Sequence, residues 1–193
     1  MTLDDLRTAL ADAPGRDWLR DAEARVRADP GRIFAQADRK MGRQPLPAAP
    51  DWTAGQAARA VLLAELNDAD RIMALYHHGD TAERLAVLRA LPLLPIGDAA
   101  VPLLHDALRA NDTRLVAAAL GPYAEHLDPA AWRQGVLKCV FMGVPLTAVH
   151  GLDRRADGEL TAMLAALAAE RGAAGRALPA DATALLERTK EQH

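Results

Sequence analysis

Apolar and polar residues recur with the period of an α-helix through most of the chain. Before residue 44, apolar positions return every three or four residues, and Gly15 and Pro30 separate the periodic segments. These segments lie near 3–13, 16–28 and 31–41. No segment alternates with period two for long enough to predict a sheet. The pattern therefore predicts an all-α protein.

Short polar residues mark the start of one helix after another beyond residue 52. Thr53 with Gln56, and Asp80 with Glu83, have the spacing of a capping box, in which the third helical side chain bonds back to the cap. Asp128 precedes a proline, which suits the first helical position. These signals predict short helices joined by tight turns.

One part of the sequence repeats weakly. Aligning "ERLAVLRALPLL", which begins at Glu83, with "TRLVAAALGPYA", which begins at Thr113, pairs Arg84 with Arg114 at an offset of 30 residues. Pro92 pairs with a second proline at the same offset, so we expect a shared kink or helix end. Helix pairs with such prolines are typical of HEAT repeats, although their usual period is about 40 to 47 residues. The predicted fold is a HEAT-like α-solenoid of short antiparallel helix pairs.

The segment "RQPLPAAPDW" is the clearest candidate for a linker, because its prolines remove backbone donors. It divides the chain into an N-terminal helical segment (1–43), a proline-rich linker (44–51) and a helical-repeat region (52–193). At 193 residues and 50% hydrophobic content, we expect one compact unit.

Charge and composition exclude several classes of function. The 23 basic and 26 acidic side chains are spread along the chain without a basic block, which argues against a nucleic-acid partner. The single cysteine cannot form an internal disulfide and fits a reducing compartment. The start "MTLDDLRTAL" lacks the basic region of a signal peptide, and no apolar run reaches the length of a membrane span. We expect a cytoplasmic protein.

Long contiguous stretches resemble the EboA family of bacterial and algal-plastid proteins. They include "LYHHGD", "RALPLLP", "LLHDALRANDTRLVAAALGPYAEHLDPAAWRQGVLKCVFMGVPL" and "GLDRRAD", and the resemblance covers about residues 70–175. Family members are encoded beside a prenyltransferase-like membrane protein and several enzyme homologues. The resemblance implies an accessory role in the biosynthesis or traffic of a secondary-metabolite precursor, with metabolites, pathway enzymes or the membrane prenyltransferase as partners. It carries over no catalytic residue.

The helix expected near 131–143 has an apolar face and, beside it, a narrow polar face. Cys139 and Trp132 fall on its apolar stripe, so the thiol is expected in the core and not as a nucleophile. Lys138 points about 100° away, on a narrow polar stripe with Gln134. Lys138 is therefore either a surface residue with a buried stem or a cation in a binding groove.

The repeated arginines allow two interpretations. Arg84 and Arg114 stand near the starts of their helices, where they could form salt bridges to Asp80 and Asp112 or hold an anion beside exposed amides. Near the C-terminal side, His150 precedes a polar cluster that contains Arg154.

No motif for phosphate, dinucleotide, zinc or serine-nucleophile chemistry is present. The neighbouring His77 and His78 diverge on a helix, so no metal or cofactor is expected. The leading hypothesis is a binding protein that uses six polar candidates: Arg84, Arg114, Gln134, Lys138, His150 and Arg154. The alternative is a small enzyme that acts on a phosphorylated or polyol-like intermediate, with Lys138 or His150 as acid or base.

Overall fold

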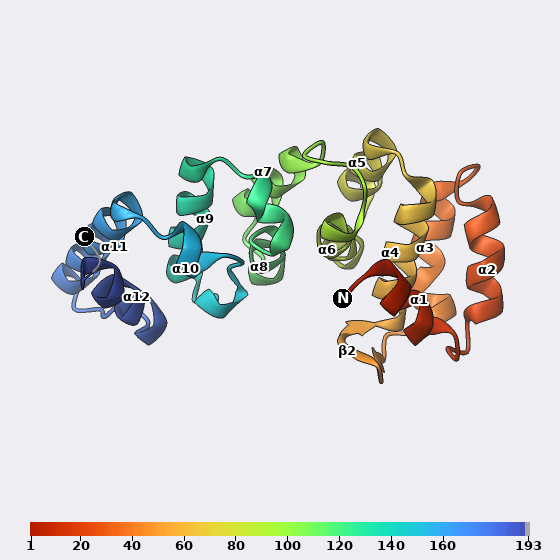
Figure 1. Ribbon diagram of the computed structural model, residues 1–193, viewed down its shortest axis with the longest axis horizontal. Helices are drawn as coiled ribbons and strands as arrows, with labels where there is room; N and C mark the ends of the chain where they lie inside the picture. The colour runs from red at the N-terminus through yellow and green to blue at the C-terminus, as the bar shows by residue number, and fades with distance from the viewer. Residues whose placement is uncertain (192–193) are drawn as a thin grey trace. The chain divides into compact units, whose positions relative to one another are not determined.

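The computed structural model describes residues 1–191, and most of them are α-helical (Figure 1). The chain forms two compact units, which we call unit 1 (residues 1–103) and unit 2 (from residue 104 onward). Unit 1 contains α1 (Leu3–Leu10), α2 (Arg16–Arg25), α3 (Pro30–Met41), α4 (Ala54–Leu66), α5 (Ala69–His78) and α6 (Thr81–Ala90). The first three helices confirm the segments that the apolar pattern predicted.

The boundary between the units falls at the start of α7 (Val101–Arg109). Unit 2 continues with α8 (Thr113–Ala119), α9 (Pro129–Met142), α10 (Leu152–Arg155), α11 (Gly158–Ala173) and α12 (Ala180–Glu191). Three 3₁₀-helices connect α-helices at Leu91–Leu93, Pro122–His126 and Leu146–Ala148. The structure therefore confirms a mainly helical fold.

The proline-rich segment forms most of a small antiparallel hairpin. Its strands are β1 (Pro45–Leu46) and β2 (Ala49–Thr53), and Leu46 pairs with Ala49 across the turn. Both of these side chains are buried, whereas Pro45 and Pro50 are exposed. Proline is tolerated at the edge of a sheet, because the missing N–H faces solvent there. The expectation that the chain contains no sheet was wrong at this hairpin.

Helix α4 forms the centre of unit 1. Its sequence "AGQAARAVLLAEL" is buried on nearly every side, which is typical of a helix inside a core and not of one on a surface. It packs against α1, α2 and α3, which precede the hairpin, and against α5 and α6, which follow it. The segments on the two sides of residues 44–51 thus share one core, and the division into two units lies near residue 103 instead.

A buried arginine ties α4 to its neighbours. The Arg59 side chain is only 3% exposed, and its Nη1 donates to Asp38 Oδ1 at 2.6 Å while Nη2 lies 3.9 Å from Glu83 Oε1. Arg59 Nε also donates to the Phe34 carbonyl, and the guanidinium lies over the Phe34 ring, 5.3 Å from its centroid. Gly55 permits this arrangement, since a Cβ atom there would collide with Asp38 Oδ1. A charge at this depth is tolerated because it is paired.

The predicted helix starts are confirmed by their side-chain bonds. Thr53 and Asp80 form complete capping boxes with Gln56 and Glu83, and Asp128 accepts the Ala131 N–H at 2.9 Å. The two aligned prolines also behave alike. Pro92 lies in the 3₁₀-helix that follows α6, and Pro122 begins the one that follows α8 and Gly121. Each proline therefore marks a helix end, as expected.

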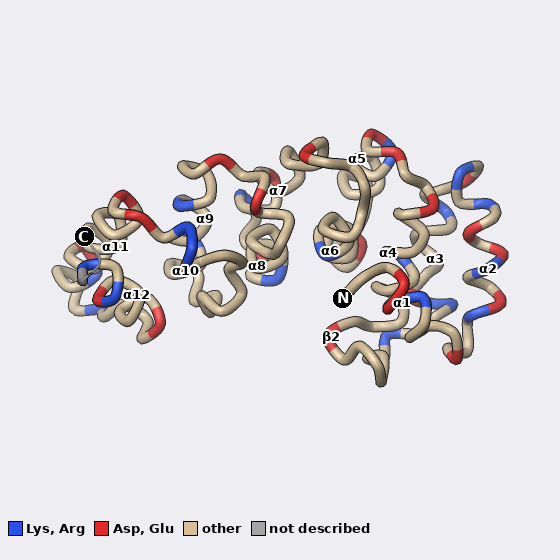
Figure 2. Tube along the Cα trace, in the orientation of Figure 1, with Lys and Arg blue, Asp and Glu red and all other residues tan. Residues whose placement is uncertain are grey.

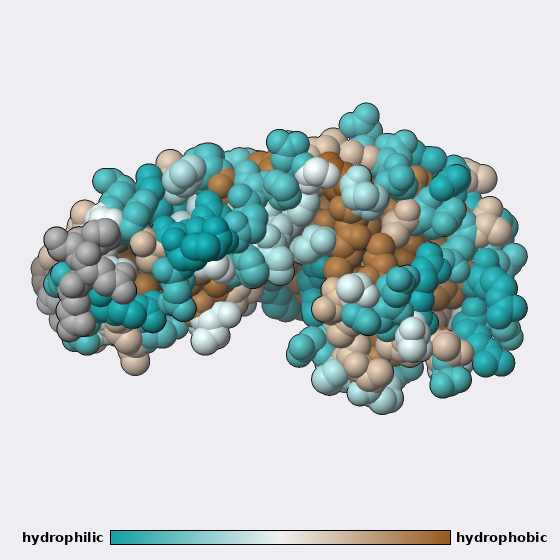
Figure 3. Space-filling model, in the orientation of Figure 1, coloured by the Kyte–Doolittle hydropathy of each residue, from teal (hydrophilic) through white to brown (hydrophobic). Residues whose placement is uncertain are grey.

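The visible faces of the units differ in polarity. In Figure 3, hydrophobic residues gather on unit 1 around α4, α5 and α6, whereas unit 2 is mostly hydrophilic. Figure 2 shows that α2 carries charges of both signs along its length, and that α10 carries basic residues. Within residues 1–191, no helix combines the length and apolarity that crossing a membrane requires.

Candidate functional site

Helix α9 supplies one wall of a groove in unit 2. It begins at the Asp128 cap with a proline at its first position and ends at Gly143, whose φ of 72° lies in the left-handed region. Its buried face includes Trp132 and Cys139, as the periodicity predicted. The neighbouring face, which carries Lys138, lines a groove of about 600 Å³ together with residues of α7 and α11.

We call this the Lys138 groove. Its polar lining residues are His105, Arg109, Asn111, Gln134 and Lys138. Its apolar side chains are Leu108, Ala131, Leu137, Phe141, Met142 and Leu167. Among the lining residues that the structure describes, none is Asp or Glu. The groove is therefore basic and amide-rich along one part and apolar along the rest.

Lys138 is the distinctive group in this groove. The residue is half-buried, and its ammonium has no hydrogen-bond or ion-pair partner within the described part of the chain. By contrast, Arg109 lies 3.4 Å from the Asp106 carboxylate, so its charge is locally paired. Lys138 therefore borders the groove without a charge partner among the described residues.

The apolar part of the groove is accessible. Phe141, on the last turn of α9, is 74% exposed although it is a large hydrophobic residue. Gly135 lies on the groove wall and allows close packing, because a Cβ atom there would lie 2.9 Å from Leu120 Cδ2. An exposed aromatic ring close to a cation suits a ligand that has both an apolar body and a negative charge.

Cys139 is separate from this surface. The thiol is fully buried, and burial is the main cause that raises its pKa to about 12, with a smaller contribution from the Asp181 carboxylate. A neutral thiol is a poor nucleophile. The prediction of a core cysteine is therefore supported, and the adjacent Lys138 does not activate it.

His150 and Arg154 meet at a residue that the sequence analysis missed. Glu125 Oε1 lies 3.4 Å from His150 Nε2 and also accepts a hydrogen bond from Arg154 Nη2. The Arg154 hydrogen bond is the main cause that lowers the pKa of Glu125. All three side chains are exposed to solvent. No local motif marked Glu125, because its partners lie more than twenty residues away along the chain.

This cluster does not line the Lys138 groove. Arg154 instead borders a second hollow of about 570 Å³, where Arg188 pairs with Asp153 at 2.6 Å and Asp181 accepts the Leu146 N–H at 2.8 Å. The charges around this hollow are thus satisfied by neighbouring residues. Neither of these two hollows is lined by both Lys138 and His150.

The two aligned arginines have different partners. Arg114 pairs with Asp112, one of the two arrangements that the sequence allowed, with its Nη2 donating to Oδ2 at 2.7 Å. Arg84 does not pair with Asp80, because that carboxylate caps α6. Its guanidinium instead donates to the carbonyls at the end of α5, to Gly79 at 3.1 Å and to His77 at 3.2 Å. Arg84 is the fourth residue of α6 and Arg114 the second of α8, so they reach different groups.

The adjacent histidines make separate local contacts. His78 Nδ1 lies 2.8 Å from the Ala74 carbonyl, and the His77 ring packs edge-on against Tyr76. Within residues 1–191, no three His, Cys, Asp or Glu side chains are grouped as metal ligands would be.

The fold and the groove define a mainly helical protein with a basic, partly apolar surface in unit 2. The chain belongs to the EboA family, because the family described as "Metabolite traffic protein EboA" matches residues 35–187. This match confirms the resemblance and extends it over the hairpin and α4, well before residue 70. No curated protein and no solved structure matches the chain.

Proposed function

We propose that this protein binds an amphipathic, negatively charged metabolite in the Lys138 groove, as an accessory to the biosynthesis or traffic of a secondary-metabolite precursor. The description of its family supports a role connected with metabolites. The groove supports the chemical class of the ligand. Its volume of about 600 Å³ lies within the range of about 300 to 1,000 Å³ that small-molecule sites occupy.

The observation that carries this proposal is the half-buried residue Lys138, which lines the groove and has no hydrogen-bond or ion-pair partner within residues 1–191. Withdrawing a cation from water costs free energy unless an opposite charge compensates it. A carboxylate or phosphate group on a ligand would supply that charge. The amide groups of Gln134 and Asn111 line the same groove and are able to donate further hydrogen bonds to such an anion.

The rest of the lining suits the body of the ligand. Phe141, Leu137 and Leu167 line the groove as apolar side chains, and Phe141 is largely exposed without a ligand. Covering apolar surface contributes about 25 cal/mol per Å². A ligand with an apolar body would therefore gain affinity from these residues, while the charge sets its orientation.

Two finer predictions belong to the same proposal. The matching pattern of helix and proline at Thr81–Leu93 and Thr113–His126 supports HEAT-like helix pairs, because equivalent helix ends recur in equivalent places. The expected site of action remains the cytoplasm, with pathway enzymes or the membrane prenyltransferase as further partners. Affinity capture from the native host tests these partners independently of the groove.

The small molecules that co-purify with the protein test the proposal. We expect mass spectrometry to detect an anionic, partly apolar compound on the wild-type chain and to find it strongly depleted on Lys138→Met. The matched control is Lys40→Met, because Lys40 is an exposed lysine on α3 that does not line the groove. Equal retention by all three proteins, or only neutral compounds on the wild type, would contradict the proposal.

A further inference from the structure

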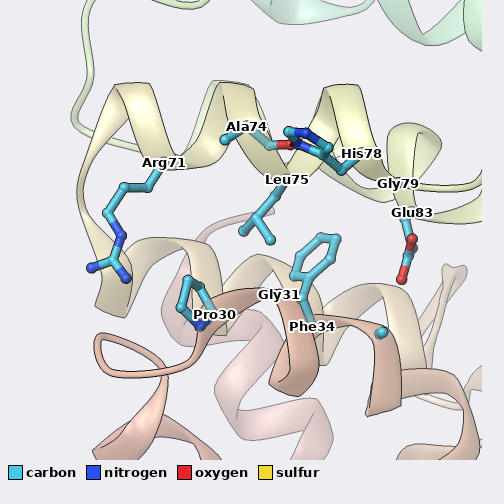
Figure 4. Close-up of a pocket in the computed structure, with 10 residues that line it drawn as sticks. Pro30, Gly31, Phe34, Arg71, Ala74, Leu75, His78, Gly79 and Glu83 are labelled. Carbon is cyan, nitrogen blue, oxygen red and sulfur yellow. Dashed lines mark hydrogen bonds between the residues drawn. The ribbon is translucent and has the colours of Figure 1, made fainter.

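Helix α3 turns one face toward the core of unit 1 and the opposite face toward solvent. Its buried residues are Ile33, Phe34, Ala37 and Met41, and Phe34 points toward Leu75 of α5 (Figure 4). Because successive residues of an α-helix are rotated by about 100°, residues with the opposite phase lie on the outward face. Neither the core nor the Lys138 groove uses this outward face.

Basic side chains follow this outward face. Arg32 and Arg39 are seven residues apart, which returns them to nearly the same direction, and Lys40 is next to Arg39. At about 1.5 Å per residue, these three extend over about 12 Å of the helix axis. Arg43 follows the Gly42 cap at the end of the helix. All four basic residues are exposed, and we call them the α3 basic stripe.

Most of the α3 basic stripe has no compensating charge in the protein. Within residues 1–191, the side chains of its three helical members have no ion-pair or hydrogen-bond partner. Arg43 Nε lies 3.4 Å from Asp38 Oδ2, but the Arg43 side chain remains 80% exposed. Asp38 is the single acidic residue of α3, and its Oδ1 already accepts from the buried Arg59 at 2.6 Å. The carboxylate nearest to the stripe is therefore largely engaged in the core.

The adjoining helix adds little negative charge to oppose the stripe. On α2, Asp17, Asp21 and Glu23 each form an ion pair with an arginine. Asp29, just before α3, is the remaining acidic residue of this segment. Residues 16–43 carry eight basic and five acidic side chains, whereas the whole chain carries 23 and 26. The segment is thus basic within a chain that is acidic overall, which orients the chain toward a negative surface.

The α3 basic stripe offers charge without an apolar anchor. The large hydrophobic side chains that are exposed in the described part of the chain are Met1 and Phe141, and neither lies on α3. Specific protein partners are held mainly by aromatic or aliphatic anchors at the centre of the interface. Long cationic side chains without fixed partners instead suit a surface whose charges are mobile and laterally spread, such as the headgroups of an anionic bilayer.

We propose that the α3 basic stripe docks unit 1 on a bilayer surface that contains anionic phospholipids. The contact is electrostatic, and the basic side chains approach the lipid phosphates and carboxylates without entering the hydrocarbon. Each basic residue close to such a surface strengthens binding by about fivefold. This interaction does not depend on the ligand of the Lys138 groove, which lies in unit 2.

The test is co-sedimentation of the full chain with vesicles made of equal parts of phosphatidylserine and phosphatidylcholine. At an ionic strength of about 0.1 M, the Debye length is about 10 Å, so the membrane attracts the stripe while more distant acidic residues are screened. We expect binding to these vesicles, no binding to pure phosphatidylcholine vesicles, and release at about 1 M salt, where the Debye length is about 3 Å. Equal binding to both kinds of vesicle, or no binding to either, would overturn the proposal.

A pair of substitutions locates the contact. Arg32→Gln/Arg39→Gln removes two charges from exposed positions, and we expect at least tenfold weaker binding to the phosphatidylserine vesicles. Arg32→Lys/Arg39→Lys keeps the charges and should bind as the wild type does.

The matched control is Arg176→Gln/Lys190→Gln, which removes two exposed charges from unit 2 and gives the same net charge as Arg32→Gln/Arg39→Gln. It should retain vesicle binding. Equal loss of binding in the two glutamine variants would show that net charge and not the α3 basic stripe is responsible, and would overturn the proposal.

Discussion

The two units place their basic side chains in opposite situations. In unit 1, the guanidinium of Arg59 is almost completely buried, and Asp38 and Glu83 stand beside it. In unit 2, the half-buried residue Lys138 lines a groove and has no charge partner among the described residues. The first cation is neutralised by the fold itself, whereas the second remains available to a ligand.

A charged side chain that stabilises the fold can be distinguished from one that is available for binding a ligand. Burial alone does not make this distinction, because Arg59 is more deeply buried than Lys138. What separates them is whether the compensating charge belongs to the protein.

The largest expected effect concerns Cys139, which lies in the core beneath the Lys138 groove and stays uncharged because it is buried. Burial raises the pKa of Cys139 to about 12, which is three units above the reference value of 9.0. The thiolate fraction should therefore be about a thousandfold lower than in the unfolded chain at pH 8. We expect reaction with a disulfide reagent to be slower by a similar factor in the native protein than in denaturant.

Comparable rates of thiol reaction in the native and the denatured protein would contradict the burial of a neutral Cys139 thiol. Cys139→Ser provides the corresponding binding control. It should retain the groove ligand, since the side chain at this position does not reach the surface.

The next effect concerns the paired charge in unit 1. Asp38→Ala leaves Arg59 buried without its nearest carboxylate, and breaking a buried pair in this way costs about 3 to 5 kcal/mol. We expect the free energy of unfolding, measured with denaturant, to fall by about 3 kcal/mol. Part of this loss should return in the double variant Asp38→Ala/Arg59→Met, which removes the unpaired charge. A change of less than about 0.5 kcal/mol in the single variant would contradict the role given to this pair.

The smallest effect concerns an exposed pair in unit 2, between Arg114 and Asp112. The hydrogen bond from Arg114 is the main cause that lowers the pKa of Asp112 to about 2. Because the folded pKa lies below the unfolded value of about 3.9, the pair stabilises the fold above about pH 4 and loses this effect as pH falls toward 2. In Arg114→Ala, an NMR titration should show the Asp112 pKa rising toward its ordinary value. An unchanged pKa would show that the pairing is not the cause.

The features that sequence reasoning predicted are those decided by neighbouring residues. The Asp80 cap with Glu83 and the Asp128 cap before a proline act within a few residues, so their spacing reveals them. The placement of Lys138 and Cys139 on different faces follows from the helical period alone. The pairing of Arg114 with Asp112 is likewise local, and it was one of the two arrangements that the sequence allowed.

The features that it missed depend on contacts between distant segments. Asp38 is 21 residues from Arg59, and Glu125 is 29 residues from Arg154, so no spacing rule joins them. The hairpin was missed because exposed prolines concealed the buried Leu46 and Ala49, whose pairing across the turn sets the register. The groove itself requires α7 and α11 to lie beside α9, which the sequence of α9 does not encode.

The central claim is that the Lys138 groove binds an amphipathic anion through the Lys138 ammonium. It is tested by calorimetric titration with 2-naphthoate, which carries a carboxylate on an apolar aromatic body. We expect saturable binding to the wild type and to Lys40→Met, and at least tenfold weaker binding to Lys138→Met, because a charge-assisted hydrogen bond is lost. Equal affinity of Lys138→Met and the wild type for 2-naphthoate would contradict it.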